Sequence, residues 1–394
     1  MAQKKQAGAA PGARLVFIDN LRVFLTLLVI AHHAIITYSG TGGWYYHEGR
    51  QDTLTVVVSG IFCGVNQAYF MSFFFMISAY FTVGALERKG AGPFVRDRLI
   101  RLGIPLLAFD LLINPLIMWV RAVALEGYAG AFPDFLWDFT IHMRAGVGTG
   151  PLWFVLALLV FTLAYVGVRA LSRGLARPGR AEKRQEAVLP VPGAHALAAF
   201  MLVFGLLAFA VRLLMPVGRE IPFINFQIAY FPLYIGLFCA GILARRGQWF
   251  AALPDAAGPR WAAVAAACIV LMPVVLIAGG ALEGKDYLFL GGPTWQALVY
   301  AMWEPVMCVS MIAWLTILFR KRLNRGGPVQ RFLSQNAYAI YIVHAPVLVF
   351  LGLALRPVTI HPLAKFAVLF CLAAPTCCAV SVLLRKLPGA RRVL

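Results

Sequence analysis

LVFIDNLRVFLTLLVIAHHAIITY, residues 15–38, is apolar along almost all of its length. An α-helix needs about 20 consecutive, mainly apolar residues to cross the hydrocarbon core of a bilayer, so this stretch predicts a membrane-spanning helix. Arg22 and His33 lie inside it. Ionisable side chains within a membrane span are costly to bury, and by default they indicate a functional site.

The spacing of these two residues places them on one face of the predicted helix. His33 follows Arg22 by eleven residues, which corresponds to about 16 Å of rise and leaves the two side chains within roughly 20° of each other around the axis. His32 lies about 80° from that line and fits it less well. Asp19 is predicted to cap the helix or to pair with Arg22 at i+3. A structural polar pair remains the alternative to a catalytic one.

The composition extends this prediction to the whole chain. Of 394 residues, 61% are hydrophobic and 13% are charged, and the mean hydropathy is +0.79; soluble domains have about 25% charged residues. Hydropathy therefore predicts an all-α, polytopic integral membrane protein with about ten transmembrane helices. The predicted spans lie near residues 15–38, 54–85, 100–121, 150–169, 196–215, 225–244, 261–281, 295–319, 332–353 and 362–384.

The distribution of basic residues predicts the orientation of this bundle. Most of the 35 Lys and Arg residues fall in the connections that share a side with the two termini, so the positive-inside rule places both termini in the cytoplasm. The predicted organisation has a cytoplasmic tail at 1–14, a transmembrane domain at 15–385 and a cytoplasmic tail at 386–394. A flexible cytoplasmic loop rich in Arg, Pro and Gly is predicted at about 170–194.

The net charge of +19 does not indicate a nucleic-acid-binding protein. Such a site needs basic residues gathered on one face, whereas here they are spread over separate cytoplasmic segments, where contact with anionic membrane lipids accounts for most of them. The seven cysteines form no C-x-x-C pair or metal-ligand spacing, and no Walker loop, zinc-protease or nucleophile-elbow motif is present. We expect no metal, no permanently bound cofactor and no nucleic-acid partner.

Five sequence blocks resemble the membrane-bound acyltransferase-3 family. The first is the run from Asp19 to Arg22 that leads to His32 and His33, which is similar to the family's first-helix signature of a basic residue upstream of an essential histidine. The other blocks are 73–80, 98–105, 151–154, and Asn336, Ala337 and Tyr338 with Tyr341, His344 and Pro346. The block 98–105 and the run from Tyr341 to Pro346 look most like the branch that includes glucan biosynthesis protein C, a glucan succinyltransferase.

The resemblance implies an O-acyltransferase of the bacterial cytoplasmic membrane. It would move an acetyl or succinyl group from cytoplasmic acyl-coenzyme A to a hydroxyl of an extracytoplasmic or membrane-associated glycan. Arginine presents a fork of donors that suits phosphate, so four arginines are predicted to bind coenzyme A: Arg22, Arg96, Arg98 and Arg101. His33 would act as general base toward the acceptor hydroxyl or would carry the acyl group covalently, and the sequence leaves both routes open.

Further polar and aromatic residues are predicted to join the site. Glu304, in the eighth span, is expected to position His33, to bind the acceptor or to belong to a structural hydrogen-bond network. Asp110 and Asn114 form an i, i+4 pair that is predicted to bind substrate. The same role is predicted for Trp44, Tyr45, Tyr341 and His344. An interfacial aromatic belt and hydrogen bonding between helices are the alternatives for these four.

Two other classes of protein stay open. A transporter could use His33, Asp110 and Glu304 as a proton or substrate relay, whereas a lipid-binding scaffold would need none of them. The acyl group, the acceptor and the oligomeric state are not determined by the sequence.

Overall fold

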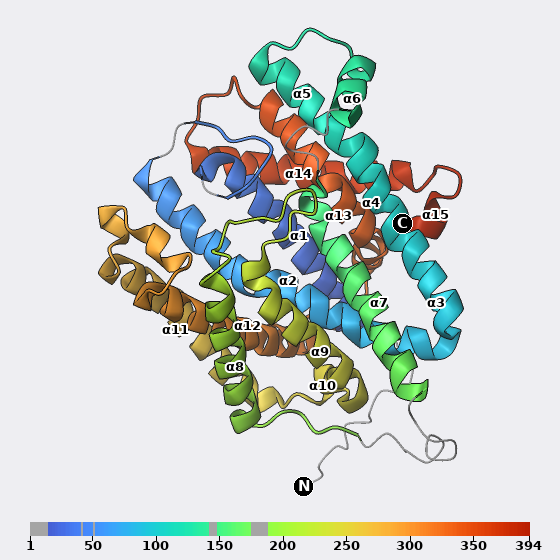
Figure 1. Cartoon of the computed structure of the whole chain (residues 1–394), viewed down its shortest axis with the longest axis vertical. Helices are drawn as coiled ribbons and strands as arrows, with labels where there is room; N and C mark the ends of the chain where they lie inside the picture. Colours follow the sequence, from blue (N-terminus) through green and yellow to red (C-terminus); the bar gives the residue numbers. More distant parts are fainter. Residues whose placement is uncertain (1–14, 41, 50–51, 142–147, 175–187) are drawn as a thin grey trace.

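The computed structural model describes residues 15–40, 42–49, 52–141, 148–174 and 188–394, and in these residues it contains helices and no β-strand (Figure 1). Ten helical segments are long and apolar enough to cross a membrane, which confirms the predicted all-α bundle. They are α1 (Val16–Ser39), α2 (Thr53–Lys89), the run from α3 to α5 (Ala91–Glu126), α7 (Trp153–Gly174), α8 (Ala194–Arg212), α9 (Phe231–Gly247), α11 (Gly258–Ala278), α12 (Trp295–Arg322), α13 (Pro328–Ala354) and α14 (Pro362–Leu384). Short helices are α6 (Phe132–Ile141), α10 (Trp249–Ala252) and α15 (Ala390–Val393).

Two predicted segments fall largely outside this description. The tail at 1–14 and the centre of the predicted loop at 170–194, residues 175–187, lie outside the described residues. At the edges of that loop, α7 continues to Gly174 and α8 begins at Ala194.

The third span departs most from its predicted limits of 100–121. The helical run is longer and consists of α3 (Ala91–Arg98), α4 (Ile104–Ala108) and α5 (Asn114–Glu126), joined by two π-helical segments. Pro105 and Pro115 stand at the start of α4 and α5. Proline has no N–H to donate and crowds the turn before it, which accounts for a widened turn on the N-terminal side of each.

α2 is the central helix of the bundle. It packs against α1, α7, α9 and α12, and its Phe75 ring contacts Phe154 of α7 (centroids 4.7 Å apart) and Tyr234 of α9 (5.2 Å). By contrast, α8 and α11 lie at an edge (Figure 1), and only 11% of the residues in their most apolar windows are buried. Their outer faces therefore suit contact with lipid, while α1, α2, α7 and α9 surround the interior.

Because consecutive spans run in opposite directions, the connections gather at two ends of the bundle. The start of α1 shares one end with the connections from α2 to α3 and from α12 to α13; we call this the N-terminal end. The connecting residues 42–49, 213–227 and 279–294 gather at the opposite end, which we call the cavity end.

Hydrogen bonds fasten the connections at both ends. At the N-terminal end, Asn20 Nδ2 donates to the carbonyl oxygen of Leu323 (2.6 Å). At the cavity end, the buried Lys365 ammonium donates to the Glu48 carboxylate, and the Glu48 backbone N–H donates to the Thr37 carbonyl oxygen (2.8 Å). This second set of bonds holds residues 42–49 against the last turns of α1, next to His33.

Candidate functional site

A cavity of about 1360 Å³ penetrates the bundle from the cavity end. Its walls come from seven helices, α1, α2, α5, α7, α9, α12 and α13, and from the connections at 42–47, 148–151, 217–230 and 286–290. Aromatic rings and a small number of polar side chains share the lining. Pockets for single small molecules occupy about 300–1,000 Å³, so this cavity has room for a more extended ligand.

His33 contributes its imidazole to the wall of this cavity. Nδ1 lies 2.9 Å from the carbonyl oxygen of Val29. A carbonyl only accepts hydrogen bonds, so Nδ1 carries the proton and Nε2 keeps a free lone pair. The Trp44 ring lies 4.4 Å from the imidazole and the His344 ring lies 5.0 Å from it. The imidazole is thus held between rings with one basic nitrogen free, as a general base or nucleophile requires.

Two further imidazoles lie close to His33. His344 is fully buried and donates from Nδ1 to the carbonyl oxygen of Tyr341, while its Nε2 has no hydrogen-bond partner among the described residues. Tyr341 lines the cavity and donates its hydroxyl to the carbonyl oxygen of Pro151. The His32 ring lies 5.5 Å from His33 and also reaches the lining. The structure therefore brings the predicted residues Tyr341 and His344 to His33.

Trp44 and Tyr45, which follow α1, line the cavity as well. Gly150 permits their approach, because its φ of 47° is left-handed and a Cβ there would overlap the Tyr45 hydroxyl. Burial raises the pKa of the Tyr45 hydroxyl, and the nearby carboxylates of Asp110 and Glu220 raise it further. The hydroxyl therefore stays protonated. It has no hydrogen-bond partner among the described residues, so it is free to donate to a ligand.

Asp110 and Asn114 lie behind this part of the wall and are not among the lining residues. Asn114 is buried and donates from Nδ2 to the carbonyl oxygen of Gly148 (2.9 Å). Asp110 lies in the π-helical segment Phe109–Ile113 and is half-buried. One side-chain oxygen of each residue has no partner within the described ranges. The Asn114 hydrogen bond supports the segment that carries Gly150. The role of both residues toward substrate stays a prediction.

Arg22 lies near the other end of the same unbroken helix as His33. Its side chain is 38% exposed and forms an ion pair with Asp19 (3.8 Å). α1 begins at Val16 without a side-chain cap, so Asp19 pairs with Arg22 and does not cap the helix. Because the helix is regular between them, Arg22 and His33 keep their predicted separation of about 16 Å on one side of α1.

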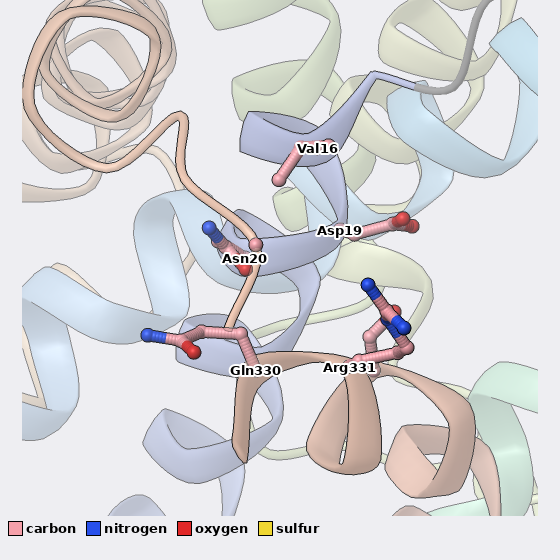
Figure 2. A pocket seen from close by; sticks show the side chains of 7 residues that line it. Val16, Asp19, Asn20, Gln330 and Arg331 are labelled. Carbon is pink, nitrogen blue, oxygen red and sulfur yellow. The ribbon is translucent and has the colours of Figure 1, made fainter. Parts of the chain in front are cut away.

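A second cavity, of about 150 Å³, lies at this N-terminal end between α1 and α13. Figure 2 shows Asp19 and Asn20 of α1 across from Gln330 and Arg331 of α13. The N-terminal end therefore combines a small hollow with several arginines.

The other arginines predicted to bind the donor lie on α3 and the π-helical segment after it. Arg96 and Arg101 are exposed, while Arg98 is half-buried with its guanidinium carbon 4.9 Å from the centre of the Phe94 ring. The Tyr338 hydroxyl donates to the Arg101 carbonyl oxygen (2.8 Å), which ties this segment to α13. None of the four predicted arginines lines the large cavity. These cations and the imidazole therefore lie toward opposite ends of the bundle.

Glu304 also lies outside the cavity lining, where it forms a buried ion pair with Arg212. The Arg212 guanidinium carbon lies 5.4 Å from the Tyr230 ring centre and 5.1 Å from that of Tyr300. Both tyrosines line the cavity. Of the three roles predicted for Glu304, these contacts match the structural hydrogen-bond network. The pair lies directly behind the two tyrosines that line the cavity. Arg212 has no sequence signal of this kind, because a cation at the end of a span is typical of a residue flanking the membrane.

Several residues of the cavity were not identified from the sequence. They are Gln67, Trp153, Tyr230, Tyr234, Tyr300, Glu220, Asn225 and Gln227. Gln67 donates to the Tyr234 hydroxyl (3.1 Å), and the two adjacent amides, Asn66 and Gln67, in an apolar span are the signal that could have identified it. The last three lie in an irregular connection, where no periodicity indicates which way a side chain points.

Comparison with known proteins covers almost the whole of this structure. The sequence profile of a family described as an acyltransferase domain matches residues 15–385. The chain is 26% identical over 366 residues to proteins named Glucans biosynthesis protein C from Salmonella schwarzengrund and Salmonella typhimurium, and these alignments cover 89% of this chain and 86% of each relative. No solved structure gives a significant match. The matched region contains all ten spans and both Arg22 and His33.

Proposed function

The chain belongs to the acyltransferase-3 family and is an integral membrane acyltransferase, and we propose that it transfers an acyl group from acyl-coenzyme A to a hydroxyl of a glycan. The observation that carries this proposal is the geometry of His33, whose fixed imidazole presents a free Nε2 in the wall of a large cavity. The relatives are named for glucan biosynthesis, which supports a glucan as the acceptor. We propose acetyl or succinyl as the acyl group.

The donor is assigned to the N-terminal end of the bundle. Coenzyme A carries phosphates, and guanidinium groups bind phosphate through charge-assisted, paired hydrogen bonds. Arg22, Arg96, Arg98 and Arg101 lie toward this end. The positive-inside rule indicates that this end faces the cytoplasm, which is the compartment that supplies acyl-coenzyme A. We propose that the membrane is the bacterial inner membrane. An extended donor arm running along α1 would bring the thioester toward His33.

The acceptor is assigned to the large cavity. Trp44 and Tyr45 present aromatic surface and a free hydroxyl there, and Tyr341 lines the same cavity. In the direct route, His33 Nε2 removes the proton from the acceptor hydroxyl as its oxygen attacks the thioester carbonyl. The C–S bond breaks and the imidazolium returns the proton to the leaving thiolate. In the covalent route the same Nε2 attacks the thioester carbonyl first, the C–S bond breaks, and the coenzyme A thiolate leaves an acyl-histidine behind. The acceptor oxygen then attacks this acyl group, the N–acyl bond breaks, and the hydroxyl proton goes to the thiolate. Both routes therefore depend on one atom.

A transporter relay through His33, Asp110 and Glu304 has less support. Glu304 is paired with Arg212 outside the cavity lining, and Asp110 lies behind the wall formed by Tyr45 and Gly150. Neither carboxylate lines the cavity that the imidazole of His33 reaches.

Mass spectrometry of envelope glycans tests the proposed function. Cells that lack the gene should lose one ester from a glycan, and its mass would identify the acyl group. Complementation with the unaltered gene or with His195→Ala should restore the ester, because His195 is an exposed histidine at the start of α8. Complementation with His33→Ala should not restore it, although the protein still inserts. An unchanged glycan profile in the deletion strain, or a restored ester with His33→Ala, would refute the proposal.

A further inference from the structure

One carboxylate in the cavity wall is held by two carboxamides. Asn225 Nδ2 donates to Glu220 Oε2 (2.9 Å), and Gln227 Nε2 donates to Glu220 Oε1 (3.0 Å). Asn225 in turn accepts from the backbone N–H of Gly150 (3.0 Å). Each carboxylate oxygen uses one of its acceptor positions and keeps the others for a ligand. All three side chains line the cavity, so they form an orientated set of hydrogen-bonding groups.

This carboxylate lies on the part of the wall that leads to His33. A Cβ built on Gly43 would lie 3.7 Å from Glu220 Oε1, so the carboxylate borders the segment that continues into Trp44 and Tyr45. The Trp44 ring lies 4.4 Å from the imidazole of His33. A ligand in contact with Glu220 would therefore run along the aromatic wall toward the reactive nitrogen.

Among the Asp, Glu, Lys and Arg side chains of the lining, the acidic ones are in the majority, in contrast to the net charge of +19 for the whole chain. Glu220 and Asp286 contribute carboxylates, and within the described residues Asp286 has no ion-pair partner. Arg121 is the one Lys or Arg that lines the cavity there, and it is paired with Glu126 (3.3 Å). The cavity thus provides little positive charge for an anionic ligand.

We propose that the cavity binds a neutral sugar unit, with Glu220, Asn225 and Gln227 hydrogen-bonded to its hydroxyls, and that Glu220 and Asp286 select against acceptors that already carry negative charge. The inference rests on the proposed function, since it specifies the acceptor of that reaction. Aromatic rings offer flat apolar faces to sugar rings, and carboxylate and amide groups pair with hydroxyls. Like charges within the cavity repel. If the acyl group is succinyl, each transfer adds a carboxylate to the glycan and makes the same sugar a poorer acceptor.

Direct binding tests this inference without any acyl transfer. Isothermal titration of the purified protein in lipid nanodiscs, without donor, would use a neutral glucose hexasaccharide and the same hexasaccharide carrying one carboxymethyl group. We expect the neutral sugar to bind about tenfold more tightly at low salt and the difference to shrink at high ionic strength, because salt screens the repulsion.

Three variants assign the effect to residues. Asp286→Asn should reduce the ratio of the two sugar affinities about threefold and leave binding of the neutral sugar unchanged. Glu220→Gln should also reduce this ratio, and it should weaken binding of the neutral sugar as well. Glu283→Gln is the matched control, because this exposed carboxylate lies on the same connection, pairs with Lys285 (2.6 Å) and does not line the cavity. It should leave both affinities unchanged.

Binding and transfer distinguish the two proposals. Equal affinity for the two sugars, no detectable binding of either, or variants that behave like Glu283→Gln would overturn the inference whatever the transfer assay shows. The predicted binding pattern without transfer from any acyl-coenzyme A would instead refute the proposed function and leave the sugar site in place.

Discussion

We propose that Arg22 binds the phosphates of the donor, so that its thioester extends along α1 toward His33. Its guanidinium is partly exposed at the N-terminal end, and its ion pair with Asp19 is long (3.8 Å). A surface ion pair of this kind contributes little to stability, so substitution should change donor binding more than folding.

Arg22→Ala should raise the KM for acyl-coenzyme A about tenfold or more, because a hydrogen bond to a charged group contributes roughly 1.5–3 kcal/mol. The KM of Arg22→Lys should lie between those of the unaltered protein and Arg22→Ala, since lysine keeps the charge and loses the fork of donors. Arg322→Ala removes an exposed arginine from the same end of the bundle and should change the KM less than twofold. Steady-state kinetics with varied donor would check this, and a lower kcat at unchanged KM would show that Arg22 acts elsewhere.

The sequence predicted the relative positions of those candidate site residues that are set by helical spacing or by closeness along the chain. Arg22 and His33 share a face because α1 is regular, and Trp44 reaches His33 because it follows the same helix closely. The partner of Glu304 was not predictable, because Arg212 lies 92 residues away on another helix. Glu220 was missed for a similar reason, since tertiary contacts alone orient an irregular connection.

Helices α8 and α12 are joined by the buried pair of Arg212 and Glu304. Arg212 is fully buried and Glu304 is 3% exposed. Nε and Nη1 of Arg212 and Oε1 of Glu304 have no hydrogen-bond partner in the described part of the chain. Removing one partner leaves an uncompensated charge in the bundle, which costs more than removing both.

Glu304→Leu should therefore destabilise the protein by about 3–5 kcal/mol and lower its thermal midpoint in detergent. Arg212→Leu combined with Glu304→Leu should recover most of that loss. The transfer rate per folded molecule should stay within a few-fold in the double variant, because neither residue lines the cavity. A single variant as stable as the unaltered protein, or a double variant that folds normally but lacks activity, would contradict the structural role of the pair.

Element limits were predictable where hydropathy changes sharply. The last span was predicted at 362–384, and α14 occupies Pro362–Leu384. The third span was predicted too short at its start, because α3 ends in the charged run Arg96, Asp97 and Arg98, which a hydropathy window excludes. The π-helical segments follow from local crowding at prolines. π-Helical turns are frequent at functional sites, and the second of these carries Asp110.

For the whole molecule, the ten spans separate two kinds of chemistry. The arginines that we propose to bind phosphate gather at the N-terminal end, and the cavity that we propose to bind sugar faces the other end. A continuous helix links them through Arg22 and His33. The composition predicted the spans, whereas the cavity depends on how many separated segments meet and has no counterpart in any one stretch of sequence.

Transfer across sealed vesicles tests this arrangement most directly. The purified protein would be reconstituted in one orientation, established by protease access to a C-terminal tag, with radiolabelled acyl-coenzyme A on one side and a neutral gluco-oligosaccharide on the other. We predict ester formation when the donor is on the side of the termini and the acceptor is on the opposite side, and none with His33→Ala. Ester formation only when both substrates share one side, or undiminished transfer by His33→Ala, would contradict transfer through the bundle at His33.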